Sequence, residues 1–196
     1  NNTIFLDNRG VSVSSDGISL NNSNNNTLTR NNATSVSGNG IIINASSHNV
    51  LINNNGTSDS GVGINVVVSS NDTLENNTGT SSSSEGILLV STANSTLRTN
   101  NGTSDSGIGI RLSGAANNTL IGNNGTSNGD AGLSVQGGSD NSTLIDNSGV
   151  STLNTGLAVD SSTNVTLINN TGSSSINSGI ELGTVTYSSV TNNTAT

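Results

Sequence analysis

The sequence predicts an all-β fold, a right-handed parallel β-helix (β-solenoid) of about 8.5 coils with no helical domain. Three observations lead to this prediction. A phrase of 23 residues returns along the whole chain, as in NSTLRTNNGTSDSGIGIRLSGAA from Asn94 and NNTLIGNNGTSNGDAGLSVQGGS from Asn117. Apolar and polar residues alternate within each phrase, which is the period of a strand. Asn, Ser, Thr and Gly supply 122 of the 196 residues, so helix formers are too scarce for a helical repeat.

The period can be followed on two independent anchors. One is an apolar residue, in most coils the Leu of Thr-Leu, and the other is a Gly that precedes two alternating apolar residues. Both anchors advance by 23 residues, except for one step of 24 that places a one-residue insertion within 136–141. Residues 1–196 are therefore expected to form a single repeat domain. The apolar anchors are Phe5, Leu28, Leu51, Leu74, Leu97, Leu120, Leu144, Leu167 and Val190, and the glycines are Gly17, Gly40, Gly63, Gly86, Gly109, Gly132, Gly156 and Gly179.

Each coil is expected to contain short parallel strands that stack on the equivalent strands of the next coil. Aliphatic residues at alternate positions follow each anchor Gly, as in Ile64 and Val66. Stacking at roughly 4.8 Å per coil gives a rod about 40 Å long. The repeat shows no cap-like segment at either terminus, so the ends of the β-helix are expected to be uncapped.

The residue three positions after the apolar anchor is Asn in all nine coils. Stacked asparagines can bond amide to amide along a rod, so this column is expected to form a structural ladder. A column of Gly or Ala follows two positions later, where we expect a narrow space that faces inward, and an unbroken Ser column comes two positions after that. The predicted ladder comprises Asn8, Asn31, Asn54, Asn77, Asn100, Asn123, Asn147, Asn170 and Asn193.

These columns resemble the right-handed parallel β-helix repeats of NosD-like and pectate-lyase-like surface proteins. The segment GIRLSGAANNTLIGNNGT, residues 109–126, has their order of Gly-Ile-x-Leu, small residues, Asn-Asn-Thr-Leu and an Asn pair. The resemblance spans essentially the whole chain, and it implies a fold rather than a reaction. Those families commonly have Ile where this chain has its Gly/Ala column, which implies a thinner cross-section here.

Composition disfavours several classes of partner. The formal net charge is −8, with four Arg and no Lys, so a basic patch for nucleic acid or an anionic membrane is not expected. One Tyr and one Phe are the only aromatic residues, too few for a base-stacking platform. No apolar run is long enough for a membrane span, and without Cys there are no disulfides or thiolate metal sites. The sequence therefore predicts no nucleic-acid partner, no membrane span and no cofactor.

The acidic residues and the single His do not form a recognisable catalytic or metal-binding set. The carboxylates of a glycoside hydrolase lie about 5–10 Å apart. Asp59 and Asp105 share a column but are two coils apart, about 10 Å by coil spacing. Asp16 and Glu85 are three coils apart. His48 replaces Asn in a column of asparagines and is interpreted as a turn substitution. We predict that the protein is not an enzyme and has no catalytic, cofactor-binding or metal-binding residues.

The sequence contains 16 Asn-x-Ser/Thr triplets, which are acceptor sequences for covalent N-glycans. One group flanks the ladder Asn and points outward by strand alternation: Asn32, Asn55, Asn76, Asn101, Asn124, Asn169 and Asn192. A second column contains Asn25, Asn71, Asn94, Asn117, Asn141 and Asn164. Both groups are candidate glycosylation sites. The second column has an alternative interpretation, a buried Asn ladder whose Thr residues only favour a strand.

These features suggest an extracellular structural glycoprotein at the cell surface. The leading hypothesis is a β-solenoid subunit that stacks head to tail with copies of itself into a filament, sheath or surface layer. The alternative is a carbohydrate-binding or adhesin stalk module of a larger surface protein, with glycan contacts in an aromatic or acidic groove. Ice binding by a regular Thr face is a third hypothesis, and Glu75 and Arg98 interrupt the array that it needs.

Overall fold

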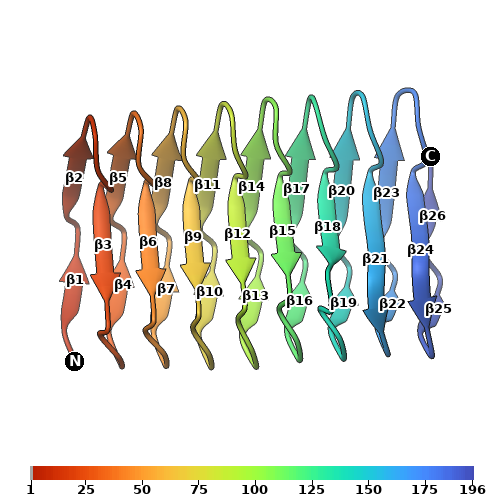
Figure 1. Ribbon diagram of the computed structural model, residues 1–196, viewed down its shortest axis with the longest axis horizontal. Helices are drawn as coiled ribbons and strands as arrows, with labels where there is room; N and C mark the ends of the chain where they lie inside the picture. The colour runs from red at the N-terminus through yellow and green to blue at the C-terminus, as the bar shows by residue number, and fades with distance from the viewer. Residues whose placement is uncertain (1) are drawn as a thin grey trace.

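The computed structural model describes residues 2–196 and confirms the predicted all-β fold. Over these residues the chain forms three parallel β-sheets, and successive coils add one strand at a time to each sheet (Figure 1). Within the same range, no helix has the length and apolar character needed to cross a membrane.

In residues 2–196 the first and second sheets have nine strands each and the third has eight. The first sheet comprises β1 (Ile4–Leu6), β4 (Thr27–Thr29), β7 (Val50–Ile52), β10 (Thr73–Glu75), β13 (Thr96–Arg98), β16 (Thr119–Ile121), β19 (Thr143–Ile145), β22 (Thr166–Ile168) and β25 (Ser189–Thr191). The second comprises β2 (Arg9–Ser12), β5 (Asn32–Ser35), β8 (Asn55–Ser58), β11 (Thr78–Ser81), β14 (Asn101–Ser104), β17 (Asn124–Ser127), β20 (Ser148–Ser151), β23 (Thr171–Ser174) and β26 (Thr194–Ala195). The third comprises β3 (Ile18–Asn21), β6 (Ile41–Asn44), β9 (Ile64–Val67), β12 (Ile87–Val90), β15 (Ile110–Ser113), β18 (Leu133–Gln136), β21 (Leu157–Thr163) and β24 (Ile180–Thr186).

The coils wind as a right-handed helix. In Figure 1 the chain rises through β1 and β2 behind, descends through β3 in front, and each further coil is displaced toward the C-terminal end. This is the hand that crossovers between parallel strands favour. Strands pair at the expected period, since Phe5 lies beside Leu28, and the single step of 24 residues brings Leu120 beside Leu144.

The one-residue insertion lies at 137–138, inside the predicted range. The N–H of Gly114 donates to the carbonyl oxygen of Gln136, and the N–H of the next residue, Ala115, donates to Ser139 Oγ. The chain therefore passes through one additional residue between Gln136 and Ser139. Both residues of this pair are Gly with positive φ, and a Cβ added to the second would meet no atom within 4 Å, so the extra residue bulges outward without disturbing the core.

Left-handed backbone conformations recur at three positions of the coil, where the chain turns between sheets. Asn adopts this region more readily than most residues with a side chain. The three columns are Asp7, Arg30, Asn53, Asn76, Thr99, Gly122, Asp146, Asn169 and Asn192; Asn22, Ala45, Val68, Ser91, Gly114, Gly137, Ser161 and Thr184; and Asn2, Asn25, His48, Asn71, Asn94, Asn117, Asn141, Asn164 and Tyr187. The high Asn content therefore has a cause besides the predicted ladder.

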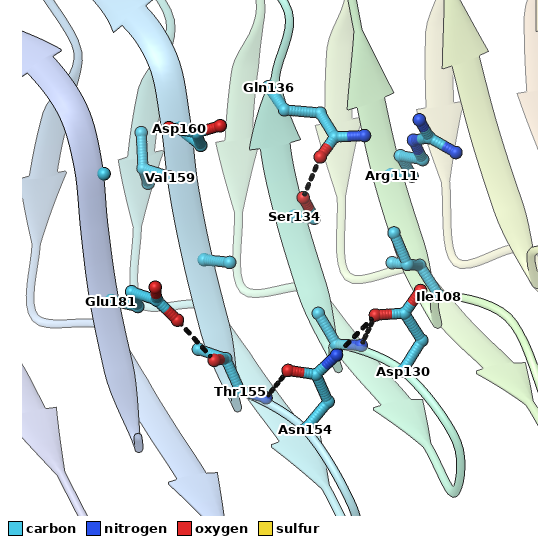
Figure 2. A pocket seen from close by; sticks show the side chains of 13 residues that line it. Ile108, Arg111, Asp130, Ser134, Gln136, Asn154, Thr155, Val159, Asp160 and Glu181 are labelled. Carbon is cyan, nitrogen blue, oxygen red and sulfur yellow. Dashed lines mark hydrogen bonds between the residues drawn. The ribbon is translucent and has the colours of Figure 1, made fainter. Parts of the chain in front are cut away.

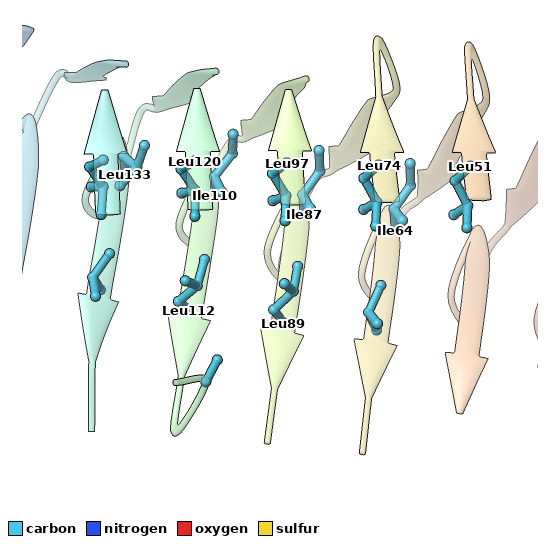
Figure 3. Close-up of a cluster of buried hydrophobic side chains, with 14 of the residues drawn as sticks. Leu51, Ile64, Leu74, Ile87, Leu89, Leu97, Ile110, Leu112, Leu120 and Leu133 are labelled. Atoms are coloured by element: carbon cyan, nitrogen blue, oxygen red, sulfur yellow. The ribbon is translucent and has the colours of Figure 1, made fainter. Parts of the chain in front are cut away.

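A slender aliphatic core runs along the axis of the rod (Figure 3). Each coil contributes the middle residue of its first-sheet strand, such as Leu74, and two alternate residues of its third-sheet strand, such as Ile64 and Val66. These side chains are fully buried. Because each coil supplies only about three of them, at roughly 1.5–3 kcal/mol each, the rest of the interior must be filled by satisfied polar groups.

The second sheet approaches the third sheet too closely for ordinary side chains. A Cβ on Gly102 would lie 2.3 Å from the carbonyl oxygen of Gly109 and 2.5 Å from Ile110 Cγ1. In the second coil Ala33 occupies this column and is fully buried. The Gly/Ala column therefore faces a narrow interior, as the sequence predicts.

The Ser column closes the turn from the second sheet to the third. Ser58 Oγ donates to the carbonyl oxygen of Gly38 in the preceding coil at 2.6 Å and accepts the N–H of Gly61 at 2.8 Å. The same two bonds recur at Ser81 and Ser127. Only a small hydroxyl side chain can both donate and accept in so tight a turn, which explains why the column is unbroken.

Candidate functional site

The nine asparagines of the predicted ladder lie in one file, which we call the uniform ladder. Asn77 donates both its backbone N–H and its Nδ2 to Asn100 Oδ1, at 2.9 and 3.0 Å, and a further Nδ2 bond reaches the carbonyl oxygen of Leu51 at 2.9 Å. The same bonds repeat from Asn31 to Asn170. Each inner amide thus uses all its hydrogen-bonding capacity inside the protein, so the ladder is structural and offers nothing to a ligand.

A second buried polar column, which we call the mixed ladder, does not stand out in the sequence because its members differ. Asn26 donates to Asn49 Oδ1 from its backbone N–H and its Nδ2, both at 3.0 Å, and Asn49 donates its N–H to Asp72 Oδ1 at 2.8 Å. Beyond Asp72 the pattern weakens, because Ser replaces the amide in the next coil. The mixed ladder comprises Asn26, Asn49, Asp72, Ser95, Asn118 and Ser142, followed by the buried Val165.

Asp72 is the exceptional member of the mixed ladder. Its side chain is buried, Oδ1 accepts two hydrogen bonds from Asn49, and Oδ2 has no hydrogen-bond partner. Burial raises the pKa of Asp72 to about 6, although the bonds from Asn49 and the charge of His48 act in the opposite direction. The carboxylate therefore occupies a position that suits a neutral amide.

The candidate glycosylation asparagines lie on the outside of the rod. Twelve of the thirteen are exposed, and Asn101 is half-buried. The alternative interpretation of the second column as a buried ladder is wrong, since Asn71 and Asn94 are exposed corner residues with φ of 58° and 55°. The buried column is the mixed ladder, one residue later along the chain. Glycosylation itself stays a prediction.

The acids considered as catalytic pairs have separate local roles. Asp16 Oδ1 accepts bonds from the N–H and Nδ2 of Asn39 at 2.8 and 2.9 Å, whereas Asp59 and Asp105 are exposed. His48 is an exposed corner residue with φ of 60°, in keeping with a turn substitution. In the part of the chain that the structure describes, no three His, Cys, Asp or Glu side chains are arranged to hold a metal ion.

A hollow of about 400 Å³ lies on the outer face of the third sheet, over β18 and β21 (Figure 2). One outward column of this sheet runs from Arg111 through Ser134 and Ala158 to Glu181, and the adjoining column ends at Gly183. Small side chains between two long ones leave the space open. The sequence contains this signal, but it becomes visible only when the strands are placed side by side.

One rim of the hollow is a chain of hydrogen bonds (Figure 2). Thr155 Oγ1 donates to Glu181 Oε2 at 2.8 Å, and the N–H of Thr155 donates to Asn154 Oδ1 at 2.8 Å. Asn154 Nδ2 then donates to Asp130 Oδ1 at 2.9 Å, and the N–H of Ala131 reaches the same oxygen at 2.7 Å. Two carboxylates are thus held at fixed points of one rim.

The opposite rim contains Arg111, Gln136 and Asp160 (Figure 2). Arg111 Nη1 forms an ion pair with Glu85 Oε1 at 2.8 Å, and its Nε lies 2.7 Å from the amide oxygen of Gln136 in the orientation that satisfies both groups. Burial acts to raise the pKa of Glu85, but hydrogen bonds from Ser84 and Arg111 outweigh it and hold the pKa below its ordinary value. The guanidinium is therefore already neutralised within the protein.

Comparison with known proteins identifies a family. The model of the family described as "Periplasmic copper-binding protein (NosD)" matches residues 1–148, well over half of the chain. Comparisons with curated proteins and with solved structures found no match.

The side chains present do not fit a copper ion. Copper sites in proteins are built from His imidazoles and from Cys or Met sulfur. The chain has one His and neither Cys nor Met, and its His48 lies at an exposed corner beside other corner residues that are mostly Asn. No chemistry that depends on copper is therefore assigned to these residues.

Proposed function

The chain belongs to the NosD family, and we propose that it works outside the cytoplasm as a rigid structural rod and not as an enzyme. The description of the family as periplasmic supports the location. The observation that carries the structural role is the uniform ladder, which joins every coil from Asn8 to Asn193 by the same bonds. In a solenoid each coil contacts only its neighbours, so a repeated bond of this kind sets the stiffness of the whole rod.

Association end to end is the second part of the proposal. The uniform ladder has a direction, because each Asn donates its backbone N–H to the coil that follows. A second copy placed after Asn193 could accept that N–H on its own Asn8 Oδ1 and continue the pattern.

N-glycans on the outward asparagines are the third part. Corner residues such as Asn94 and Asn117 are exposed and do not take part in the buried ladders. Because neighbouring coils are only about 4.8 Å apart, adjacent sites in one column cannot all carry glycans. Glycopeptide mass spectrometry of protein from its native source checks this, and unmodified Asn at all thirteen positions would remove the glycoprotein part.

Small-angle scattering and electron microscopy test the rod. The proposal expects elongated particles at low concentration and end-to-end filaments with a repeat of about 40 Å at high concentration. Monodisperse single rods at every concentration would support the rod and contradict the filament part of the proposal. A globular particle would contradict both. Release of products from plant, fungal or bacterial polysaccharides would contradict the non-enzymatic role.

A carbohydrate-binding stalk module is the second candidate function. The hollow on the third sheet favours it, because this is a concave polar site on a rigid scaffold. The two functions are compatible, since a rod can present a binding site on one of its faces.

A further inference from the structure

We propose that the hollow on the third sheet binds a ligand that carries a protonated primary amine among hydroxyl groups, of the class of deacetylated amino-sugar oligosaccharides. The inference does not depend on the structural role, and it rests on the second candidate function, for which it names a ligand class at the same hollow. It rests on the shape of the hollow, on the hydrogen-bonding groups that line it, and on the charge that these groups leave unbalanced.

The hollow has the size and layering of a small-ligand site. Its volume of about 400 Å³ falls within the range of ligand pockets in proteins. Ile108, Ala131 and Val159 are buried beneath it, and the polar residues stand around its rims. The floor consists of strands β18 and β21, whose inner faces pack on the aliphatic core through Leu133, Val135 and Leu157.

The lining offers acceptors of hydrogen bonds in excess of donors. Asp130 and Glu181 each use one carboxylate oxygen in the rim, and within residues 2–196 Asp130 Oδ2 and Glu181 Oε1 accept no hydrogen bond. Asp160 accepts from Ser161 through Oδ2, while its Oδ1 points across the strand toward Gly183, where a Cβ would lie 2.7 Å away. Ionised carboxylates accept hydrogen bonds and do not donate them, so these oxygens can bind N–H or O–H groups of a ligand.

The charge of the lining is negative. Of its four charged side chains, Arg111 is paired with Glu85, and within residues 2–196 Asp130, Asp160 and Glu181 form no ion pair. Asp160 and Glu181 lie on adjacent strands, as outward residues on a diagonal, because Ala158 pairs with Glu181. An ammonium group bound in the hollow would be attracted by both of these carboxylates.

The same features exclude other ligand classes. Uronic acids, phosphates and sulfates would be repelled by the three carboxylates, and the Arg111 guanidinium is already paired with Glu85. A neutral sugar would find no aromatic side chain on which to stack, because the lining contains none. Selectivity must therefore come from the positive charge of the ligand, and the hydroxyl groups of a sugar match the acceptors and amides of the rims.

Isothermal titration calorimetry on the folded chain, in a mildly acidic buffer of low ionic strength, tests the proposal. The probes are a glucosamine tetramer, the fully N-acetylated tetramer, a galacturonate oligomer and spermidine. The glucosamine tetramer should bind, its affinity should fall with added salt, and the acetylated and anionic oligomers should bind at least about tenfold more weakly. Equal binding of the two tetramers overturns the proposal. Spermidine binding as tightly as the glucosamine tetramer overturns its saccharide part.

Isosteric variants locate the site. Glu181→Gln and Asp160→Asn should each weaken binding of the glucosamine tetramer by about tenfold, because each removes one charge-assisted bond. Asp105→Asn is the matched control, an exposed acid outside the hollow, and should leave the affinity unchanged. Circular dichroism establishes that each variant is folded. If both hollow variants bind the glucosamine tetramer with unchanged affinity, or if the control loses as much affinity as they do, the hollow is not the binding site.

Discussion

The uniform ladder and the mixed ladder are both buried polar columns along the same rod, yet they differ in how completely their groups are bonded. In the uniform ladder every inner Asn meets another Asn, and each amide donates and accepts to capacity. In the mixed ladder Asp72 leaves one oxygen without a partner, and Val165 interrupts the polar run before Ser188. A buried polar column therefore stabilises a solenoid through completeness of bonding, because an unpaired buried group costs more than a made bond contributes.

The largest expected effect comes from truncating the uniform ladder. Asn100→Ala would leave the backbone N–H of Asn77 without a partner, and the Nδ2 of Asn77 and the carbonyl oxygen of Leu74 would each lose one bond. We expect the free energy of unfolding to fall by about 4 kcal/mol. Asn118→Ala, the matched change in the mixed ladder, removes one short bond, from the N–H of Ser95, and a long one to Thr92, and should cost about 2 kcal/mol. Urea unfolding measures both, and equal losses would contradict the distinction between the ladders.

Asp72→Asn should stabilise the protein. The substitution replaces the unpaired oxygen by an amide nitrogen, and in Asn26 the equivalent nitrogen donates to the carbonyl oxygen three residues earlier. At neutral pH the buried charge is also removed, and a pKa raised from 3.8 to about 6 corresponds to about 3 kcal/mol. Urea unfolding at neutral pH checks the gain. Asp105→Asn, an exposed acid, serves as the control and should change stability little. A destabilised Asp72→Asn variant would mean that the carboxylate is required.

The advantage of Asp72→Asn should depend on pH in a defined direction. The folded-state pKa of Asp72 is raised, so its charge penalises the folded state fully above about pH 6. As the pH falls from about 6 to about 4 the group becomes protonated in the folded protein, and the penalty disappears. The difference in unfolding free energy between the variant and the original chain should therefore shrink over this window. A constant difference would show that Asp72 does not titrate there.

The smallest effect is expected for asparagines that stack on the surface. Asn55 Nδ2 donates to Asn32 Oδ1 at 3.3 Å, but both residues are exposed. Asn32→Ala should therefore change the unfolding free energy by less than about 0.5 kcal/mol. Thermal unfolding followed by circular dichroism is sufficient to detect a larger loss, which would show that stacking of Asn side chains stabilises the coil even in water.

The fold follows from the sequence because one coil is repeated with almost no change in length. The two anchors determine the register between neighbouring coils. A column of identical residues, such as the one from Asn8 to Asn193, can then be recognised in the aligned repeats. The mixed ladder escapes this reasoning because Asn, Asp, Ser and Val alternate in it. The second column of candidate glycosylation asparagines lies one residue before the buried column, since sequence alone does not show which of two adjacent asparagines adopts the left-handed conformation at the turn.

The hollow could not be predicted by reading along the chain. It forms where Ser134, Ala158 and Gly183 come together from three strands, each more than 20 residues from the next. None of these residues is unusual within its own coil. Clustered acids and spaced motifs can be recognised within one coil or along one column of equivalent residues. The hollow instead results from a change in side-chain size across two neighbouring columns.

Hydrogen exchange of the Asn side-chain amides, followed by NMR, tests the stacked ladder most directly. The Nδ2 protons of Asn54, Asn77, Asn100 and Asn123 are bonded within the interior and should exchange far more slowly than those of the corner residue Asn94. Strong protection of this column, and weak protection of the exposed asparagines, is the predicted result. Exchange of the column at the rate of the exposed asparagines would show that its amides face water and that the coils are not held together in this way.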